Sequence, residues 1–174
     1  MMKLRRCSAS PRVYVLRFTF YVSRFTLRPV SKKSAKIAAL IERCQGGDLN
    51  AHYLGYFECF NAGLFYEAHD VLEELWLAQR HEPNDAFYKG LIQLAGAFVH
   101  LQKHTGARPR LRPAVALLRL ARANLEKFAP VHERLDVKGT LGLIDGWLTR
   151  LNSVGPGVNP LAADAPKLFP LPSK

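Results

Sequence analysis

Acidic residues are absent from the first 33 positions of this 174-residue chain, where nine lysines and arginines occur. These basic residues account for most of the formal net charge of +11, so residues 34–174 carry only about +2. A basic charge spread over a whole domain is typical of nucleic-acid-binding proteins. This chain does not have that charge pattern, because its excess of basic residues lies in residues 1–33. The charge therefore describes an N-terminal segment, and the remainder of the chain is close to neutral.

Cysteine is scarce, and long apolar runs are missing. The three cysteines, Cys7, Cys44 and Cys59, have no CxxC or metal-ligand spacing, which excludes a disulfide framework and a zinc knuckle. No stretch approaches the roughly 18 apolar residues that a transmembrane helix requires. We therefore expect a soluble, cytoplasmic protein with reduced thiols, or an organellar protein if residues 1–33 act as a transit peptide.

Several catalytic motifs are also absent. The chain has no glycine-rich phosphate loop and no GxSxG, so nucleotide hydrolysis and serine-hydrolase chemistry have no support. It has neither HExxH nor the Glu-x-x-His element of di-iron bundles. Short motifs alone therefore identify no reaction.

Residues 1–33 contain a near-repeat of seven residues, Tyr14–Phe20 followed by Tyr21–Leu27. The repeat is rich in aromatic and β-branched residues, which favour an extended backbone. We expect this region to be a basic N-terminal extension that is disordered or dispensable for folding. The alternatives are a transit peptide and an arm that contacts nucleic acid.

Apolar residues recur with helical spacing from Ser34 onward, and no segment of the domain alternates with a period of two. The expected helices cover about residues 34–45, 50–60, 65–80, 84–104, 114–129 and 137–152. The sequence thus predicts an all-α domain over residues 34–153, a single compact bundle of about five to six helices. Residues 154–174 are rich in proline and glycine and are expected to form a flexible tail.

The stretch Asn61–Trp76 places a histidine and several carboxylates on one expected helix. At about 100° per residue, His69 and Glu73 border the apolar face of this helix. By the same geometry Glu67 and Glu74 project to the opposite side. The acids therefore separate into two groups, and Glu73 belongs with the histidine.

The next expected helix carries a polar stripe of Gln93, His100 and His104, flanked by the small residues Gly90 and Ala97. The stripe lies about 130° away from the main apolar face of its helix. Small residues allow another helix to approach closely and to form hydrogen bonds. We expect that the histidine-bearing edge of the preceding helix meets this stripe.

Three interpretations of these residues stay open. In the first, the polar groups satisfy one another at a seam between helices. In the second, the seam opens into a ligand pocket lined by Tyr66 and Trp76. In the third, His69 and Glu73, four residues apart on one helix, ligate a divalent metal together with His100 or His104.

Gly63–Trp76 reads Gly-Leu-Phe-Tyr-Glu-Ala-His-Asp-Val-Leu-Glu-Glu-Leu-Trp, and Phe87–Ala95 reads Phe-Tyr-Lys-Gly-Leu-Ile-Gln-Leu-Ala. The two blocks resemble the small helical family catalogued as domain of unknown function 309, over about residues 53–128. The resemblance implies a compact all-α fold and no established activity. It also implies six characteristic polar residues, which form the candidate site: Glu67, His69, Glu73, Trp76, Gln93 and His100. The chain has Asp70 and Lys89 where the family usually has Glu and Gln.

We interpret the domain as a non-enzymatic binding or interaction module built around the seam of His69, Glu73, Gln93 and His100. The alternative is a metal-dependent enzyme that uses His69, Glu73 and His100, so the question of catalysis stays open. Nucleic-acid association through the basic arm is a third hypothesis. We expect no cofactor. The expected partner is an unknown small molecule or protein rather than nucleic acid or a membrane.

Overall fold

Six α-helices form in the part of the chain that the computed structural model describes, residues 35–105, 110–153, 158, 160–162 and 165–172. They are α1 (Ala35–Arg43), α2 (Ala51–Asn61), α3 (Phe65–Ala78), α4 (Asp85–Gln102), α5 (Leu111–Leu125) and α6 (Val137–Ser153). The expected all-α bundle is thereby confirmed. The expected basic extension over residues 1–33 lies outside the described residues.

Local sequence signals set the ends of the first helices. Asn50 caps α2, because its side-chain oxygen accepts a hydrogen bond from the His52 backbone N–H at 2.9 Å. Gly63 separates α2 from α3 with a φ of +75°, a backbone conformation that favours glycine. The Gln102 side chain donates a hydrogen bond to the Gly63 carbonyl at 2.7 Å, so the end of α4 holds this turn.

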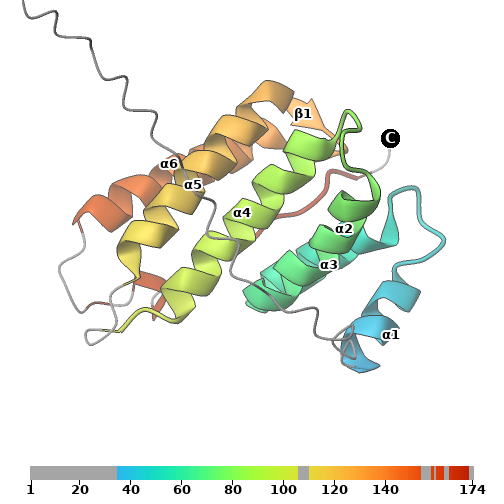
Figure 1. Ribbon diagram of the computed structural model, residues 1–174, viewed down its shortest axis with the longest axis horizontal. Helices are drawn as coiled ribbons and strands as arrows, with labels where there is room; N and C mark the ends of the chain where they lie inside the picture. The colour runs from blue at the N-terminus through green and yellow to red at the C-terminus, as the bar shows by residue number, and fades with distance from the viewer. Residues whose placement is uncertain (1–34, 106–109, 154–157, 159, 163–164, 173–174) are drawn as a thin grey trace, which may run out of the picture. The chain divides into compact units, whose positions relative to one another are not determined.

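α4 lies between α3 and α5 in the helical bundle (Figure 1). Aromatic rings from α2, α3 and α4 meet in the core. The Phe60 ring centroid lies 5.0 Å from that of Phe65 and 5.6 Å from that of Phe98. The buried Tyr56 hydroxyl donates a hydrogen bond to the Leu91 carbonyl at 3.0 Å. Burial of these large side chains stabilises the bundle, and the buried hydroxyl of Tyr56 is satisfied.

A glycine allows α5 to approach α4 closely. A Cβ placed on Gly90 would lie 2.8 Å from Cγ of Leu125, a distance that real contacts do not show. Leu125 is fully buried, so it fills the space that the missing side chain leaves. The small-residue stripe predicted on α4 therefore receives α5.

A short hairpin was not expected from the sequence. β1 (Val131–His132) pairs antiparallel with β2 (Leu135–Asp136). Two-residue strands are too short to give a period-two pattern. The turn between them also lacks the usual Asn-Gly signature, since Glu133 and Arg134 take the positive φ values of 45° and 58°.

Part of the described C-terminal segment packs against the bundle, which differs from the expected flexible tail. Leu168 is buried, and the Asn61 side chain bonds both to its carbonyl at 2.7 Å and to its N–H at 2.8 Å. Pro170 forms a bridge with Leu135, and Pro160–Ala162 form a short 3₁₀-helix, η2. Proline-rich composition argues against regular structure, but it leaves packing against a preformed bundle possible.

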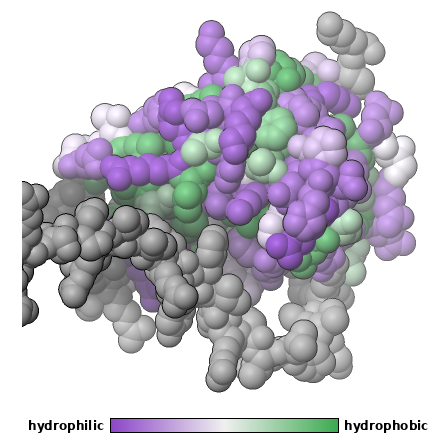
Figure 2. All heavy atoms as spheres, turned by 45° about the horizontal axis from the view of Figure 1, so that its top comes forward, coloured by the Kyte–Doolittle hydropathy of each residue, from purple (hydrophilic) through white to green (hydrophobic). Residues whose placement is uncertain are grey.

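The surface of the described residues is mixed in character. Figure 2 shows one face, on which hydrophilic side chains surround smaller apolar areas. Tyr66 and Leu77 of α3 are among the large apolar residues that are about half exposed. Within the described ranges, none of the helices has the length and apolar character needed to span a bilayer.

Candidate functional site

Trp76 links the end of α3 to the start of α4. Its indole Nε1 donates a hydrogen bond to Oδ1 of Asp85 at 2.6 Å, and Asp85 lies in the first turn of α4. The guanidinium of Arg80 stacks 5.0 Å from the centre of the indole ring. The only polar atom of the indole side chain is thus satisfied within the fold. This tryptophan therefore has a structural role in joining two helices.

Gln93 also has a partner within the fold. Its Oε1 accepts a hydrogen bond from Nδ2 of Asn124 on α5 at 2.9 Å. This bond lies beside the close contact of Gly90 with Leu125, so the same face of α4 packs against α5. The structure therefore pairs the glutamine with α5, whereas the sequence analysis placed it opposite α3.

His69 lies near α4 at a different position. A Cβ placed on Gly96 would lie 3.9 Å from Cδ2 of His69 and 3.4 Å from Cδ1 of Leu117. Side chains of α3 and α5 therefore both come close to α4 at this glycine. The expected seam is divided, because His69 lies against Gly96 while Gln93 is bonded to Asn124.

Three side chains of α3 bring metal-ligating atoms together. His69, Asp70 and Glu73 each offer one ligand atom, and these atoms all lie within 4.8 Å of one another. Nδ1 of His69 lies 3.3 Å from Oδ1 of Asp70, and both side chains are partly exposed. The sequence analysis did not include Asp70 among the candidate ligands. A helical wheel gives the direction of each Cα–Cβ bond, but it does not give the positions that a carboxylate can reach by side-chain rotation.

The outward side of α3 is strongly acidic. The helix has four acidic residues and no lysine or arginine. The carboxylate of Asp70 has the largest effect in raising the pKa of the Tyr66 phenol, followed by partial burial and then by Glu73 and Glu67. Lys103 offsets part of the negative potential at Tyr66, because its Nζ lies 5.6 Å from the centre of the Tyr66 ring. The negative potential on this helix suits a cation.

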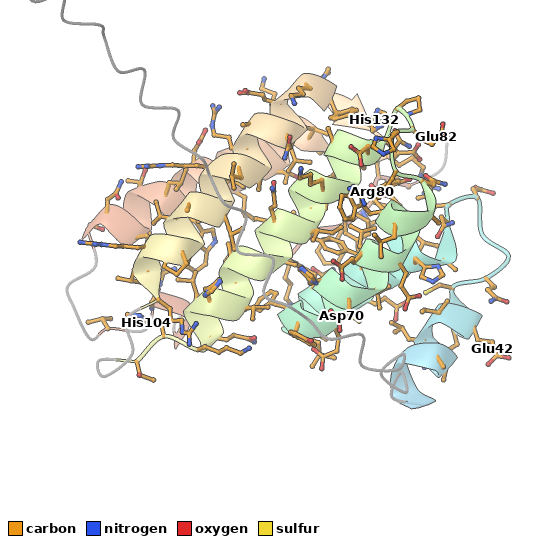
Figure 3. The ribbon with its side chains drawn as sticks, viewed as in Figure 1. Glu42, Asp70, Arg80, Glu82, His104 and His132 are labelled. Atoms are coloured by element: carbon orange, nitrogen blue, oxygen red, sulfur yellow. The ribbon has the colours of Figure 1, made fainter. Side chains whose placement is uncertain are left out.

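His100 belongs to a separate place, at the C-terminal end of α4. The group of possible metal ligands among the described residues does not include it. Its Nδ1 is buried without a hydrogen-bond partner in the described part of the chain. Burial, followed by the charges of Arg110 and Lys103, lowers the pKa of His100. Figure 3 shows its neighbour His104 where α4 ends, apart from Asp70 on α3.

A polar network that the sequence did not reveal fixes the hairpin to the bundle. Oδ1 of Asn84 lies 2.7 Å from Nε2 of His132, and its Nδ2 donates to Oε1 of Glu133 at 2.9 Å. The Tyr53 hydroxyl donates to the Glu133 carbonyl at 3.0 Å. The His132 ring also packs 4.7 Å from the ring of Phe87. These contacts account for the network as structural support.

Two hollows in the described part of the molecule lie away from the acidic edge of α3. One, of about 560 Å³, lies between α6 and the C-terminal segment and is lined by Trp147, Arg150, Pro166 and Lys167 among others. The other, of about 390 Å³, is lined by residues 78, 79 and 82–84. Neither has His69 or Glu73 in its wall.

The family model described as Domain of unknown function (DUF309) matches residues 53–108. This match confirms the resemblance inferred from the two sequence blocks, over a shorter range than the expected 53–128. It covers α2 from Tyr53 onward, α3 and α4. No curated protein and no solved structure matches the chain.

Proposed function

We propose that this chain, whose residues 53–108 belong to the family described as Domain of unknown function (DUF309), is a binding module that holds a divalent metal ion at His69, Asp70 and Glu73. One observation carries the proposal: the ligand atoms of the three side chains lie within 4.8 Å of one another. The proposal keeps the binding role expected from the sequence and moves its centre from a seam between helices to one edge of α3.

The family's other polar residues support this choice by elimination. Trp76 is bonded to Asp85, and Gln93 is bonded to Asn124, so both have structural explanations. His69 and Glu73 sit instead on a partly exposed edge of α3. A residue whose polar atoms are not needed to hold helices together is a better candidate for a ligand.

The donor set suits a first-row divalent metal. Bonds of roughly 2.0–2.2 Å to nitrogen and oxygen place donors on opposite sides of an ion about 4 Å apart. Side chains within 4.8 Å of one another therefore need only small rotations to converge. One imidazole and two carboxylates favour zinc or manganese over calcium, which prefers oxygen alone.

The proposal is limited to metal binding, because the two hollows described above have neither His69 nor Glu73 in their walls. Three protein ligands would leave the remaining coordination positions to water, an arrangement that catalytic metal sites share. A bound cation would also reduce the repulsion among the four carboxylates of α3.

The test is a calorimetric titration of tag-free, metal-free protein with zinc and with manganese. Glu73→Gln and His69→Ala each remove one ligand and are expected to weaken binding at least tenfold. Glu74→Gln is the matched control, since it removes the same charge from α3 outside the ligand group. Equal affinity in Glu73→Gln and Glu74→Gln, or no binding to the unaltered chain, would overturn the proposal.

A further inference from the structure

The larger of the two hollows lies between α6 and the C-terminal segment and has a volume of about 560 Å³. Small-molecule pockets have volumes of about 300–1,000 Å³, so this hollow has the size of a ligand site. Residues 165–167 form one part of its lining. The rest comes from α6, at a spacing that puts side chains on one face of a helix: Leu143, Gly146, Trp147 and Arg150. All of these residues lie in the described part of the chain.

Both sides of the hollow are fixed to the core of the bundle. On the side of α6, the Trp147 ring packs edge-on against Phe98 of α4, with 5.1 Å between the ring centroids. On the other side, the buried Leu168 directly follows the lining residues 165–167. The Asn61 side chain bonds to the carbonyl and to the N–H of Leu168. The hollow therefore lies between two elements that tertiary contacts hold in place.

Trp147 has a hydrogen-bond donor that the fold does not use. The residue is only 8% exposed. Its indole Nε1 has no hydrogen-bond partner among the described residues, and it is not one of the enclosed unpaired atoms, so solvent reaches it. The N–H of a buried tryptophan usually finds a partner, as that of Trp76 does with Asp85. The indole N–H of Trp147 is therefore available to an acceptor from outside the chain.

The two charged groups that line the hollow are both positive. The guanidinium of Arg150 lies over the Trp147 ring, 4.9 Å from its centre, and Lys167 is exposed. No carboxylate of the described residues pairs with either side chain, and the lining itself contains no acidic residue. A guanidinium that stacks on a ring keeps its N–H groups at the edge of its plane, where a carboxylate can accept two of them. An anionic group is therefore favoured in the hollow.

The remaining lining is apolar. Leu143 and Pro166 contribute carbon atoms to the wall, and the indole ring of Trp147 adds an aromatic surface. Removal of such surface from water favours an occupant that has an apolar body. A simple inorganic anion would leave this surface uncovered.

We propose that the hollow between α6 and the C-terminal segment binds a small carboxylic acid with an apolar body. Arg150 and Lys167 bind the carboxylate, which also accepts a hydrogen bond from Nε1 of Trp147. The apolar body covers Leu143 and Pro166. No proposed metal ligand lines the hollow, so this site is independent of the metal site on α3.

The indole N–H signals of the two tryptophans test the proposal in one NMR titration of the full chain. Cinnamate is the probe, because it combines a carboxylate with an apolar body. We expect a saturable shift of the Trp147 signal and an unchanged Trp76 signal, since the N–H of Trp76 is already bonded to Asp85. Cinnamyl alcohol lacks the charge and sodium acetate lacks the apolar body, so each should bind at least tenfold more weakly. The absence of a saturable shift with cinnamate, or equal binding of either comparison compound, would overturn the proposal.

A variant that fills the hollow has a matched control on the same helix. A Cβ at Gly146 or at Gly142 would meet no heavy atom within 4 Å, and leucine favours a helix more than glycine does. Both Gly146→Leu and Gly142→Leu should therefore fold. Only Gly146 lines the hollow, so Gly146→Leu should weaken cinnamate binding at least tenfold while Gly142→Leu leaves it unchanged. Equal affinity in the two variants would exclude this hollow as the site.

Charge variants test the recognition of the carboxylate. Lys167→Gln changes an exposed side chain and should weaken cinnamate binding several-fold. Arg150→Gln should have a larger effect, because it removes the paired N–H donors. Lys138→Gln, an exposed change on α6 outside the lining, is the control and should bind as the unaltered chain does. If Lys167→Gln and Arg150→Gln both bind like the control, the assignment of the carboxylate is wrong.

Discussion

Gln93 of α4 accepts a hydrogen bond from Asn124 of α5, with 2.9 Å between Oε1 and Nδ2. The glutamine lies in one of the two sequence blocks that resemble the family, and its partner lies beyond the matched residues 53–108. Gln93, a polar residue that the sequence offers as a candidate ligand, therefore forms a hydrogen bond between α4 and α5 in the fold. The predictions below follow from contacts of this kind.

Replacement of Asn124 by leucine should lower the free energy of unfolding by about 1–3 kcal/mol, because it leaves the partly buried Oε1 of Gln93 without a donor. Urea denaturation of Gln93→Leu, Asn124→Leu and the double variant gives the coupling energy. We expect the double variant to lose less stability than the two single variants combined. Strict additivity would show that the bond contributes nothing.

Gly90→Ala should destabilise the bundle by about 1–3 kcal/mol, since its new methyl group would overlap Leu125 at 2.8 Å. Gly142→Ala on α6 is the matched control. A Cβ at Gly142 would meet no heavy atom within 4 Å, so this change should stabilise its helix by about 0.5–1 kcal/mol. Thermal unfolding of both variants should therefore show shifts of opposite sign. Two shifts in the same direction would contradict the close packing of α4 on α5.

Stability should decrease as the pH falls below about 6.5, the usual pKa of histidine. Burial and the charges of Arg110 and Lys103 lower the pKa of His100 in the folded chain, so the unfolded chain binds its proton first. The contribution is fully present above the unfolded pKa and is lost as the pH falls through the folded one. Urea denaturation between pH 7.5 and pH 5 should show a smaller loss for His100→Gln than for the unaltered chain. An equal loss in both would argue against this assignment.

Asn61→Ala should release the C-terminal segment from the bundle. The side chain of Asn61 makes both hydrogen bonds that hold the Leu168 backbone. Hydrogen exchange at the Leu168 amide should accelerate at least tenfold, while amides in α4 stay protected. Asn152→Ala, an exposed change near the end of α6, is the control and should leave the Leu168 amide slow. Unchanged exchange in Asn61→Ala would show that other contacts hold the segment.

The sequence was sufficient to predict the helices because their signals are local. The recurrence of apolar residues and a cap such as Asn50 depend on neighbours within one or two turns, and α2 begins at Ala51, within one residue of the expected start. The hydrogen-bond partner of Gln93 could not be predicted in the same way, because it does not depend on local sequence. Which helix packs on a stripe depends on the path of the whole chain, and α3 and α5 both lie beside α4.

Two other features could not be predicted for physical reasons. Asn61 and Leu168 are 107 positions apart, and the proline-rich composition of the segment describes its local preferences and not its contacts. Asp70 joins His69 through the reach and rotation of its side chain, which a wheel of backbone directions omits. The family resemblance marked His69 and Glu73, and the geometry added Asp70 to them.

The fit of Leu125 over Gly90 also shows that the segment matched by the family model packs against residues that lie beyond it. The family match stops at residue 108, before α5 begins at Leu111. A fragment cut at that point would expose to water the face of α4 that Ala114, Leu118, Ala121 and Leu125 cover in the complete bundle. We therefore expect a fragment that ends at residue 108 to be less stable than the complete bundle, because α4 would lose the apolar contacts that α5 supplies.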